Sequence, residues 1–258
     1  MKLARFFEFV AESEFYNDSL NPLFWKDDEF DPEIREKLLQ IAQDFYEDLE
    51  VDIPIEDIQL TGSLANYNWT KYSDLDVHVI MDLSQVNDDV ELVKKAMDGL
   101  RFQWNQRHPV VIRGHDVELY AQDVNQVHLA SGLYSLMNGE WIRKPEFNPP
   151  TVDPKDVYRK VEAYGVQIEK LKEALESAKP DEAKQILDMA SALKKKISKA
   201  RDEKLARKGG EFSVENLVFK KMRNNGMFGD LIDIKAEAYS RMYSEPYNQK
   251  IKKEDEAA

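Results

Sequence analysis

The chain has no cysteine, and its 258 residues include four histidines. The absence of cysteine excludes disulfides, cysteine nucleophiles and thiolate metal sites, and fits a reducing compartment. The histidines show no zinc-type spacing, so a bound metal ion should be held by oxygen ligands. The sequence also lacks an apolar run long enough to span a membrane and a segment that resembles a secretory signal. We therefore expect a cytoplasmic protein with no membrane partner.

Positive charge is scarce relative to negative charge. The chain has 36 Lys and Arg against 49 Asp and Glu, which gives a net charge of −13. Nonspecific binding to nucleic acid depends on clustered basic side chains that neutralise phosphates, so we expect no strong nonspecific binding to DNA. Residues 194–208 are locally basic, which is compatible with a small anionic substrate or one nucleic-acid end. A hydrophobic content of 42% predicts a folded protein with one large domain or two modest ones.

The most informative stretch is residues 59–82, QLTGSLANYNWTKYSDLDVHVIMD. Apolar and polar residues alternate before a Gly-Ser turn and again over residues 75–81, and a period of two predicts strands. Asp74 and Asp76 therefore project from one face, at the start of a strand whose other face is core. Two neighbouring carboxylates repel each other unless a cation lies between them. Mg²⁺ is a natural partner, because it usually takes one or two carboxylates together with substrate phosphates.

The sequence Gly62-Ser63, a spacer of ten residues and then Asp74-Leu75-Asp76-Val77 resembles the signature of the DNA polymerase β-type nucleotidyltransferase superfamily. The resemblance implies metal-dependent transfer of a nucleoside monophosphate from an NTP to a hydroxyl acceptor, with release of pyrophosphate. It implies that Asp74 and Asp76 bind Mg²⁺ or Mn²⁺. It also implies that Gly62 and Ser63 hold the outer phosphates of the nucleotide, where a glycine lets the backbone turn sharply and approach closely.

The same resemblance implies a third acid, between apolar residues on a nearby strand. Glu118 in Val-Glu-Leu fits, and we predict that it binds the metal with the two aspartates and helps to deprotonate the acceptor hydroxyl. Asp116, on the same face two residues away, is the main alternative, and Asp123 is the next. His78 lies on the face of the two aspartates, where we expect a structural histidine with satisfied hydrogen bonds.

The pattern around the signature predicts an α+β fold, with a small mixed sheet and helices on one of its faces. Asp31-Pro32 is typical of a helix start, and Asp89 caps a second helix that runs to about Trp104, with Leu100 facing inward. Residues 110–121 contain two apolar runs around Arg113-Gly114, which indicates a hairpin. Over residues 126–145 we expect one or two helical turns, then a tight turn and a short strand.

An all-helical domain is expected to follow the sheet. We predict four parts, namely an N-terminal segment 1–30, a catalytic domain 31–148, a helical domain 149–246 and a charged tail 247–258. The boundary rests on Asn148-Pro149-Pro150, which breaks regular structure. Two apolar stripes joined by a short turn at residues 179–181 predict an antiparallel helical hairpin. In the family that the chain resembles, the helical region often closes over the nucleotide and selects the acceptor. The basic residues that could do so here are Lys204, Arg207, Lys208, Lys220, Lys221 and Arg223.

Residues 1–12, MKLARFFEFVAE, resemble the capsid-targeting leaders of T4-like phage internal proteins, which are cleaved after a Glu. Glu12 would be the cleaved residue, although those sites usually carry Leu or Ile where this chain has Val10. The alternative is a terminal helix that packs on the domain. A phage origin would place the protein in the host cytoplasm or in the virion interior.

The acceptor stays open among a small-molecule hydroxyl, an RNA 3′ end, a protein side chain and a second nucleotide. Two alternatives to a free-standing enzyme also stay open. One is a non-catalytic protein that keeps the fold as a binding or virion-internal module. The other is a toxin- or antitoxin-type modifier of a host protein or tRNA, which would use the same chemistry on a different acceptor.

Overall fold

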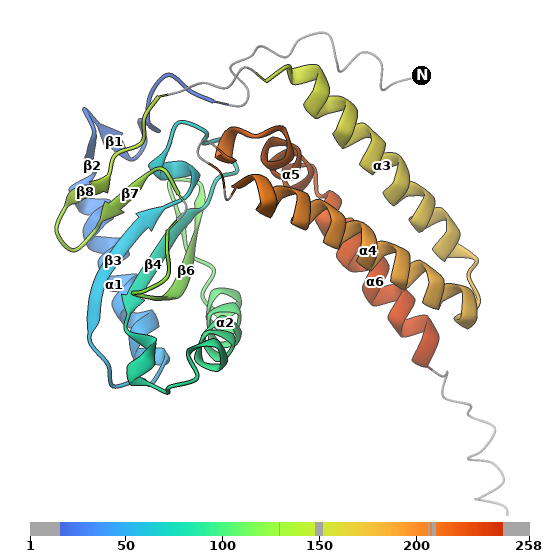
Figure 1. The fold of residues 1–258 in the computed structure, drawn as a ribbon, viewed down its shortest axis with the longest axis horizontal. Coiled ribbons are helices and arrows are strands. Elements are labelled where there is room, and N and C mark those ends of the chain that lie inside the picture. Colours follow the sequence, from blue (N-terminus) through green and yellow to red (C-terminus); the bar gives the residue numbers. More distant parts are fainter. Residues whose placement is uncertain (1–15, 129, 148–151, 206, 208–209, 245–258) are drawn as a thin grey trace, which may run out of the picture. The chain divides into compact units, whose positions relative to one another are not determined.

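A computed structural model describes residues 16–128, 130–147, 152–205, 207 and 210–244 (Figure 1). Contacts divide the chain into two compact units. One takes in the chain up to Pro154 together with Leu205–Ser213, and the other takes in Lys155–Lys204 and the chain from Val214. The segment Leu205–Ser213 thus groups with the sheet, although it lies inside the part of the sequence assigned to the helical domain. The predicted leader, the boundary at residues 148–150 and the tail 247–258 lie outside the described residues.

The first unit contains a mixed sheet, as expected, and it has six strands. Its strand order is β5-β6-β4-β3-β7-β8, and β4 pairs antiparallel with β3 but parallel with β6. All other pairs in the sheet are antiparallel. The strands are β3 (Ile55–Thr61), β4 (Leu75–Met81), β5 (Val111–Ile112), β6 (His115–Asp123), β7 (Leu133–Ser135) and β8 (Glu140–Arg143). A separate two-stranded hairpin is formed by β1 (Trp25–Lys26) and β2 (Glu29–Phe30).

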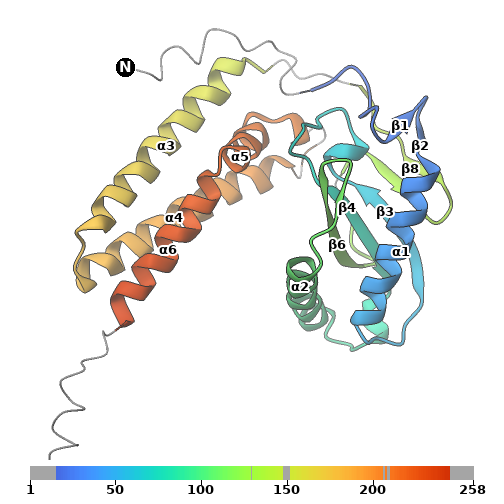
Figure 2. The same cartoon turned by 180° about the vertical axis from the view of Figure 1, so that it is seen from behind.

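Two helices cover the apolar face of this sheet. The first, α1 (Pro32–Asp48), begins where predicted, because the Asp31 carboxylate accepts hydrogen bonds from the first backbone N–H groups of the helix. It lies across the sheet in Figure 2, and α2 (Val90–Arg107) lies beside β6. The Phe45 ring of α1 meets the Trp104 ring of α2 edge to face at 5.4 Å. Both helices therefore share one core with the sheet, and the other sheet face is left to polar side chains.

Alternation along the central strands separates the two faces. Leu60, Val77 and Leu119 are fully buried on the side of α1, whereas their neighbours along each strand point the other way. Helix α2 also closes the outer edge of β6, because the Asn105 side chain exchanges two hydrogen bonds of 3.1 Å with the backbone of Leu119. The central strands β3, β4 and β6 thus form one paired platform for the polar face.

Two expectations about the first unit were wrong. Residues 126–145 contain no helical turn among those described, and Leu133–Ser135 forms β7 instead, held by pairing with β3 and β8. Leu100 is 37% exposed rather than inward, because α2 lies along the edge of β6 and buries a narrower stripe, Val93, Met97 and Trp104. The predicted hairpin of β5 and β6 and the short strand β8 are confirmed.

The second unit is helical. Its elements are α3 (Pro154–Glu176), α4 (Pro180–Leu205), α5 (Val214–Asn224) and α6 (Met227–Tyr243). Helices α3 and α4 form the predicted antiparallel hairpin (Figure 1), with buried stripes that include Ile168 and Leu171 on α3 and Ile186 and Leu193 on α4. The Lys172 ammonium of α3 lies 3.0 Å from the Asp230 carboxylate of α6. Within the described residues, no helix has the length and apolarity that a membrane crossing requires.

Candidate active site

The predicted acidic residues lie on the polar face of the sheet. The β3–β4 register places Thr61 beside Asp76, and the parallel β4–β6 register places Asp76 beside Glu118. Cross-strand partners share a face, so three neighbouring strands present Thr61, Asp76 and Glu118 in one row. Asp74 precedes β4 by one residue and falls on the same face by alternation. All three acids are half-buried. The structure thus brings Glu118 directly to the side of Asp76.

Gly62 lies against this row, at the end of β3. Its φ of +75° belongs to the left-handed region, which side chains rarely adopt. A Cβ atom at this position would stand 2.0 Å from Oδ2 of Asp76. Both the backbone conformation and the close approach of the carboxylate therefore require glycine. The Gly-Ser turn thus touches the second aspartate through Gly62, a contact that the sequence did not predict.

Ser63 ties the two ends of the intervening loop together. Its hydroxyl donates to Oγ of Ser73 at 2.8 Å, and that oxygen also accepts the backbone N–H of Thr70 at 2.9 Å. The Ser73 carbonyl lies 2.6 Å from Nδ1 of the buried His115. Ser63 begins a short 3₁₀ turn, Ser63–Ala65. The structure gives the Ser63 hydroxyl a role in closing the loop, and contact with a phosphate would require its proton to turn away from Ser73.

The loop after the turn also contacts the segment Leu205–Ser213. Nδ2 of Asn66 donates to the Glu211 carboxylate at 3.3 Å and to the Ser131 hydroxyl at 2.7 Å. Nδ2 of Asn68 donates to the Glu211 carbonyl at 3.4 Å. These contacts place the 3₁₀ turn Gly210–Phe212 beside the loop that joins β3 to β4, which explains why the segment groups with the sheet.

The two alternatives for the third acid are placed differently from Glu118. Asp116 is exposed at the start of β6, where it pairs with Val111 of β5. Asp123 is 3% exposed, and its carboxylate accepts the backbone N–H groups of Leu83 at 3.1 Å and Asn125 at 2.9 Å. Asp123 therefore fixes the loops at the far end of the sheet. Glu118 is the candidate that the register sets beside Asp76.

An aromatic and polar cluster lies next to the acids, on the same face of β4 and β6. The Tyr120 hydroxyl donates to Oε2 of Glu118 at 2.5 Å, and the Tyr120 ring stacks on the His78 ring with centroids 4.5 Å apart. Nδ1 of His78 lies 2.6 Å from Oε1 of Gln122. Burial, with a smaller contribution from the charges of His128 and Arg101, lowers the pKa of His78 to about 3. His78 is therefore neutral at pH 7 and is satisfied as predicted.

The low pKa of His78 predicts acid sensitivity. The unfolded chain takes up a proton at His78 below its ordinary pKa of 6.5, whereas the folded chain does so near 3. The contribution of neutral His78 to the free energy of unfolding is thus complete above about pH 6.5. Below that pH, the free energy of unfolding falls by ~1.4 kcal/mol per pH unit. Urea unfolding between pH 7 and pH 4.5 should show a shallower decline for His78→Gln than for wild type. Equal slopes would show that His78 titrates alike in both states.

The residues at this site can be compared with the needs of a divalent cation. Asp76 and Glu118 offer carboxylate groups on neighbouring strands, and the Asp76 carboxylate packs against Gly62 where a Cβ would otherwise stand. Two carboxylates with substrate phosphates suit Mg²⁺ or Mn²⁺. In the part of the chain that the structure describes, no three His, Asp or Glu side chains are gathered into a metal-binding group.

The predicted basic residues that the structure describes are divided between the two units. Lys220, Lys221 and Arg223 belong to α5 of the second unit, where the Lys221 ammonium stands 5.3 Å from the centre of the Tyr158 ring. Lys204 is near the end of α4, and Arg207 is exposed. Lys208 lies outside the described residues.

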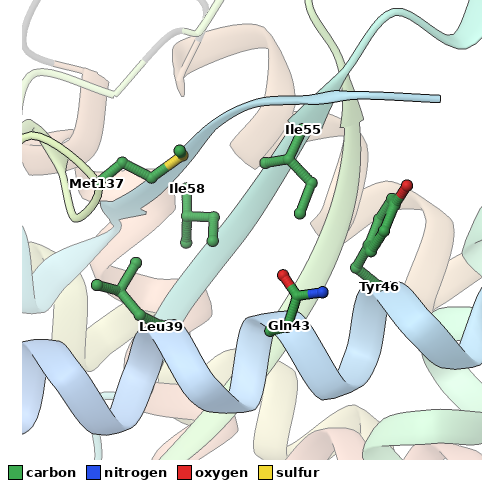
Figure 3. Close-up of a pocket in the computed structure, with 6 residues that line it drawn as sticks. All are labelled: Leu39, Gln43, Tyr46, Ile55, Ile58 and Met137. Atoms are coloured by element: carbon green, nitrogen blue, oxygen red, sulfur yellow. The ribbon is translucent and has the colours of Figure 1, made fainter.

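An open groove of about 520 Å³ lies on the other side of the sheet (Figure 3). It runs between α1 and β3, and Leu39, Tyr46, Ile55, Ile58 and Met137 make its lining mostly apolar. Ile58 belongs to the core face, opposite the carboxylates. The groove offers no titratable group other than the Tyr46 phenol, whose hydroxyl donates to the Ile53 carbonyl at 2.7 Å. This groove therefore holds no acid of the kind that the predicted metal chemistry needs.

Comparison with family models, curated proteins and solved structures gave no match.

Sequence reasoning missed two residues of this cluster, Tyr120 and Arg101. Tyr120 follows Glu118 by two positions, so strand alternation alone places it on the same face. Arg101 comes from α2, and its guanidinium stands 4.5 Å from the centre of the Tyr120 ring. No spacing in the sequence links Arg101 to β6, because the contact depends on how α2 lies along the sheet edge.

Proposed function

We propose that this protein is a metal-dependent nucleotidyltransferase of the DNA polymerase β type, with its catalytic centre on the polar face of the sheet. The observation that carries the proposal is the row of Gly62, Asp76 and Glu118, in which the glycine of the signature touches the second aspartate and the third acid lies beside it. The signature alone places two acids after a turn. The parallel register of β4 and β6 adds the third acid, because it pairs Asp76 with Glu118, 42 residues further along the chain.

In this proposal each residue has a defined task, and Glu118 has two. Asp74, Asp76 and Glu118 hold the cation, and Gly62 and Ser63 line the approach for the β- and γ-phosphates of an NTP. A divalent cation, when bound, neutralises phosphate charge and favours attack at the α-phosphorus. The acceptor oxygen forms a bond to that phosphorus, and the bond to pyrophosphate breaks. Glu118 is the acid placed to accept the proton of the acceptor hydroxyl.

The acceptor is proposed by class only. The net charge of −13 disfavours long nucleic acid, so we propose a small-molecule hydroxyl, an RNA 3′ end or a protein side chain.

Calorimetry tests the proposal. Each of the four NTPs is titrated into the wild-type chain with Mg²⁺, with Mn²⁺ and with chelator. We expect one or more NTPs to bind only with metal, and Asp74→Ala/Asp76→Ala to lose this binding because the carboxylates that hold the cation are gone. Asp44→Asn, at an exposed position on α1, is the matched control and should bind like wild type.

The opposite result is equally clear. If no NTP binds with either metal while all variants unfold at the same urea concentration, the catalytic proposal fails and a non-catalytic module takes its place. If binding is found, labelled nucleotide added to cell extracts identifies the acceptor as small molecule, RNA or protein.

A further inference from the structure

Tyr120 makes a contact that the proposed chemistry does not by itself require. Its hydroxyl donates to Oε2 of Glu118 at 2.5 Å, within the range of a charge-assisted hydrogen bond between a hydroxyl and a carboxylate. The two residues are i and i+2 on β6, so both side chains stand on the polar face. A glutamate side chain has three rotatable bonds, and a hydrogen bond to one oxygen selects among its rotamers. Because Oε2 of Glu118 accepts this hydrogen bond, Oε1 is the oxygen that can bind a cation.

The Tyr120 ring is itself held from two elements. On the β4 side, the register pairs His78 with Tyr120, and the rings stack with an interplanar angle of 11°. From α2, the Arg101 guanidinium covers the ring at 4.5 Å. Nδ1 of His78 is fixed in turn by Gln122 at 2.6 Å. These contacts restrict the ring and therefore fix where its hydroxyl stands.

We propose that Tyr120 is a positioning residue for the catalytic cation. Tyr120 holds Glu118 through Oε2, so that the other carboxylate oxygen of Glu118 is presented beside Asp76. This inference rests on the proposed function, because it assigns a partner to a proposed metal ligand. Partners that orient metal ligands typically contribute about 10–100-fold to metal affinity or activity. Tyr120 would act through Glu118 and would not touch the substrate.

The test measures Mn²⁺ binding to the full chain, through the EPR signal of the Mn²⁺ that stays free in solution. Tyr120→Phe keeps the ring between His78 and Arg101 and removes the hydroxyl, so we expect Mn²⁺ affinity to fall by about 10–100-fold. In a turnover assay the variant should need a correspondingly higher Mn²⁺ concentration and should recover near wild-type kcat when that concentration is supplied. Rescue by metal separates positioning from a general loss of structure.

Tyr46→Phe is the matched control. It also removes a phenol that donates one hydrogen bond, at 2.7 Å to the Ile53 carbonyl, but on the other side of the sheet. Its Mn²⁺ affinity should equal that of wild type. Wild-type affinity in Tyr120→Phe would overturn the positioning role and leave the proposed function intact. If wild type binds no Mn²⁺, both proposals fall together. If wild type does bind Mn²⁺, Asp76→Asn decides whether that binding belongs to this site.

Discussion

Replacing Gly62 with alanine is expected to slow nucleotidyl transfer by ~100-fold or more, the loss that follows when reacting groups are displaced by about 1 Å. The new Cβ would stand 2.0 Å from Oδ2 of Asp76, which is closer than atoms can approach. Either the carboxylate or the turn must therefore move, and both are parts of the proposed site. Single-turnover rates at saturating Mn²⁺ measure this effect directly.

Gly114→Ala is a matched control for Gly62→Ala. Gly114 has a similar φ, +85°, but a Cβ there meets nothing within 4 Å. Each substitution should cost on the order of 1–3 kcal/mol of unfolding free energy, because both glycines have a positive φ that other residues rarely adopt. Only Gly62→Ala should lose activity beyond what this destabilisation explains. Equal activities in the two variants would mean that the turn does not set the position of Asp76.

Short-range signals account for the elements that were predicted correctly. The Asp31 cap with Pro32 fixes the start of α1, and period-two alternation fixes β4 and the hairpin that contains β6. Each of these signals depends on neighbouring residues in the chain, so the sequence alone contains it. The elements with the strongest local pattern were therefore predicted best.

The elements that were missed depend on distant partners. Strand β7 has three residues, too few to distinguish a period of two from a helical turn, and pairing with β3 decides its form. Strands β1 and β2 have two residues each, and the turn between them requires positive φ at Asp27 and Asp28. The exposure of Leu100 likewise follows from the way α2 lies along β6.

Some features of the site can likewise be predicted from local sequence patterns, whereas others depend on distant partners. Alternation places Asp74 and Asp76 on one face and puts Glu118 and Tyr120 together on another strand. The sequence does not contain the parallel register that sets Glu118 beside Asp76, and it cannot show that Arg101 covers Tyr120. Residue types along a strand are therefore predictable, whereas contacts between strands and helices come from the packing.

Glu118→Gln is expected to reduce the rate of nucleotidyl transfer by ~10²–10⁴-fold, because the amide cannot accept the acceptor proton. The substitution keeps the shape of the side chain, and an amide oxygen can still accept the Tyr120 hydrogen bond. Folding should consequently change little, so urea unfolding of the variant should resemble wild type. The loss would then belong to the chemical step and to metal binding rather than to stability.

Asp116→Asn decides between the two acids of β6. Asp116 is exposed at the start of the strand, whereas Glu118 lies in register with Asp76, so Asp116→Asn should change the rate by no more than a few-fold. Both variants remove one negative charge from the same strand, which makes their general electrostatic effects comparable. If Asp116→Asn loses as much activity as Glu118→Gln, the third acid is shared between them. If Asp116→Asn alone is inactive, the assignment of Glu118 is wrong, and the cation lies closer to the start of β6.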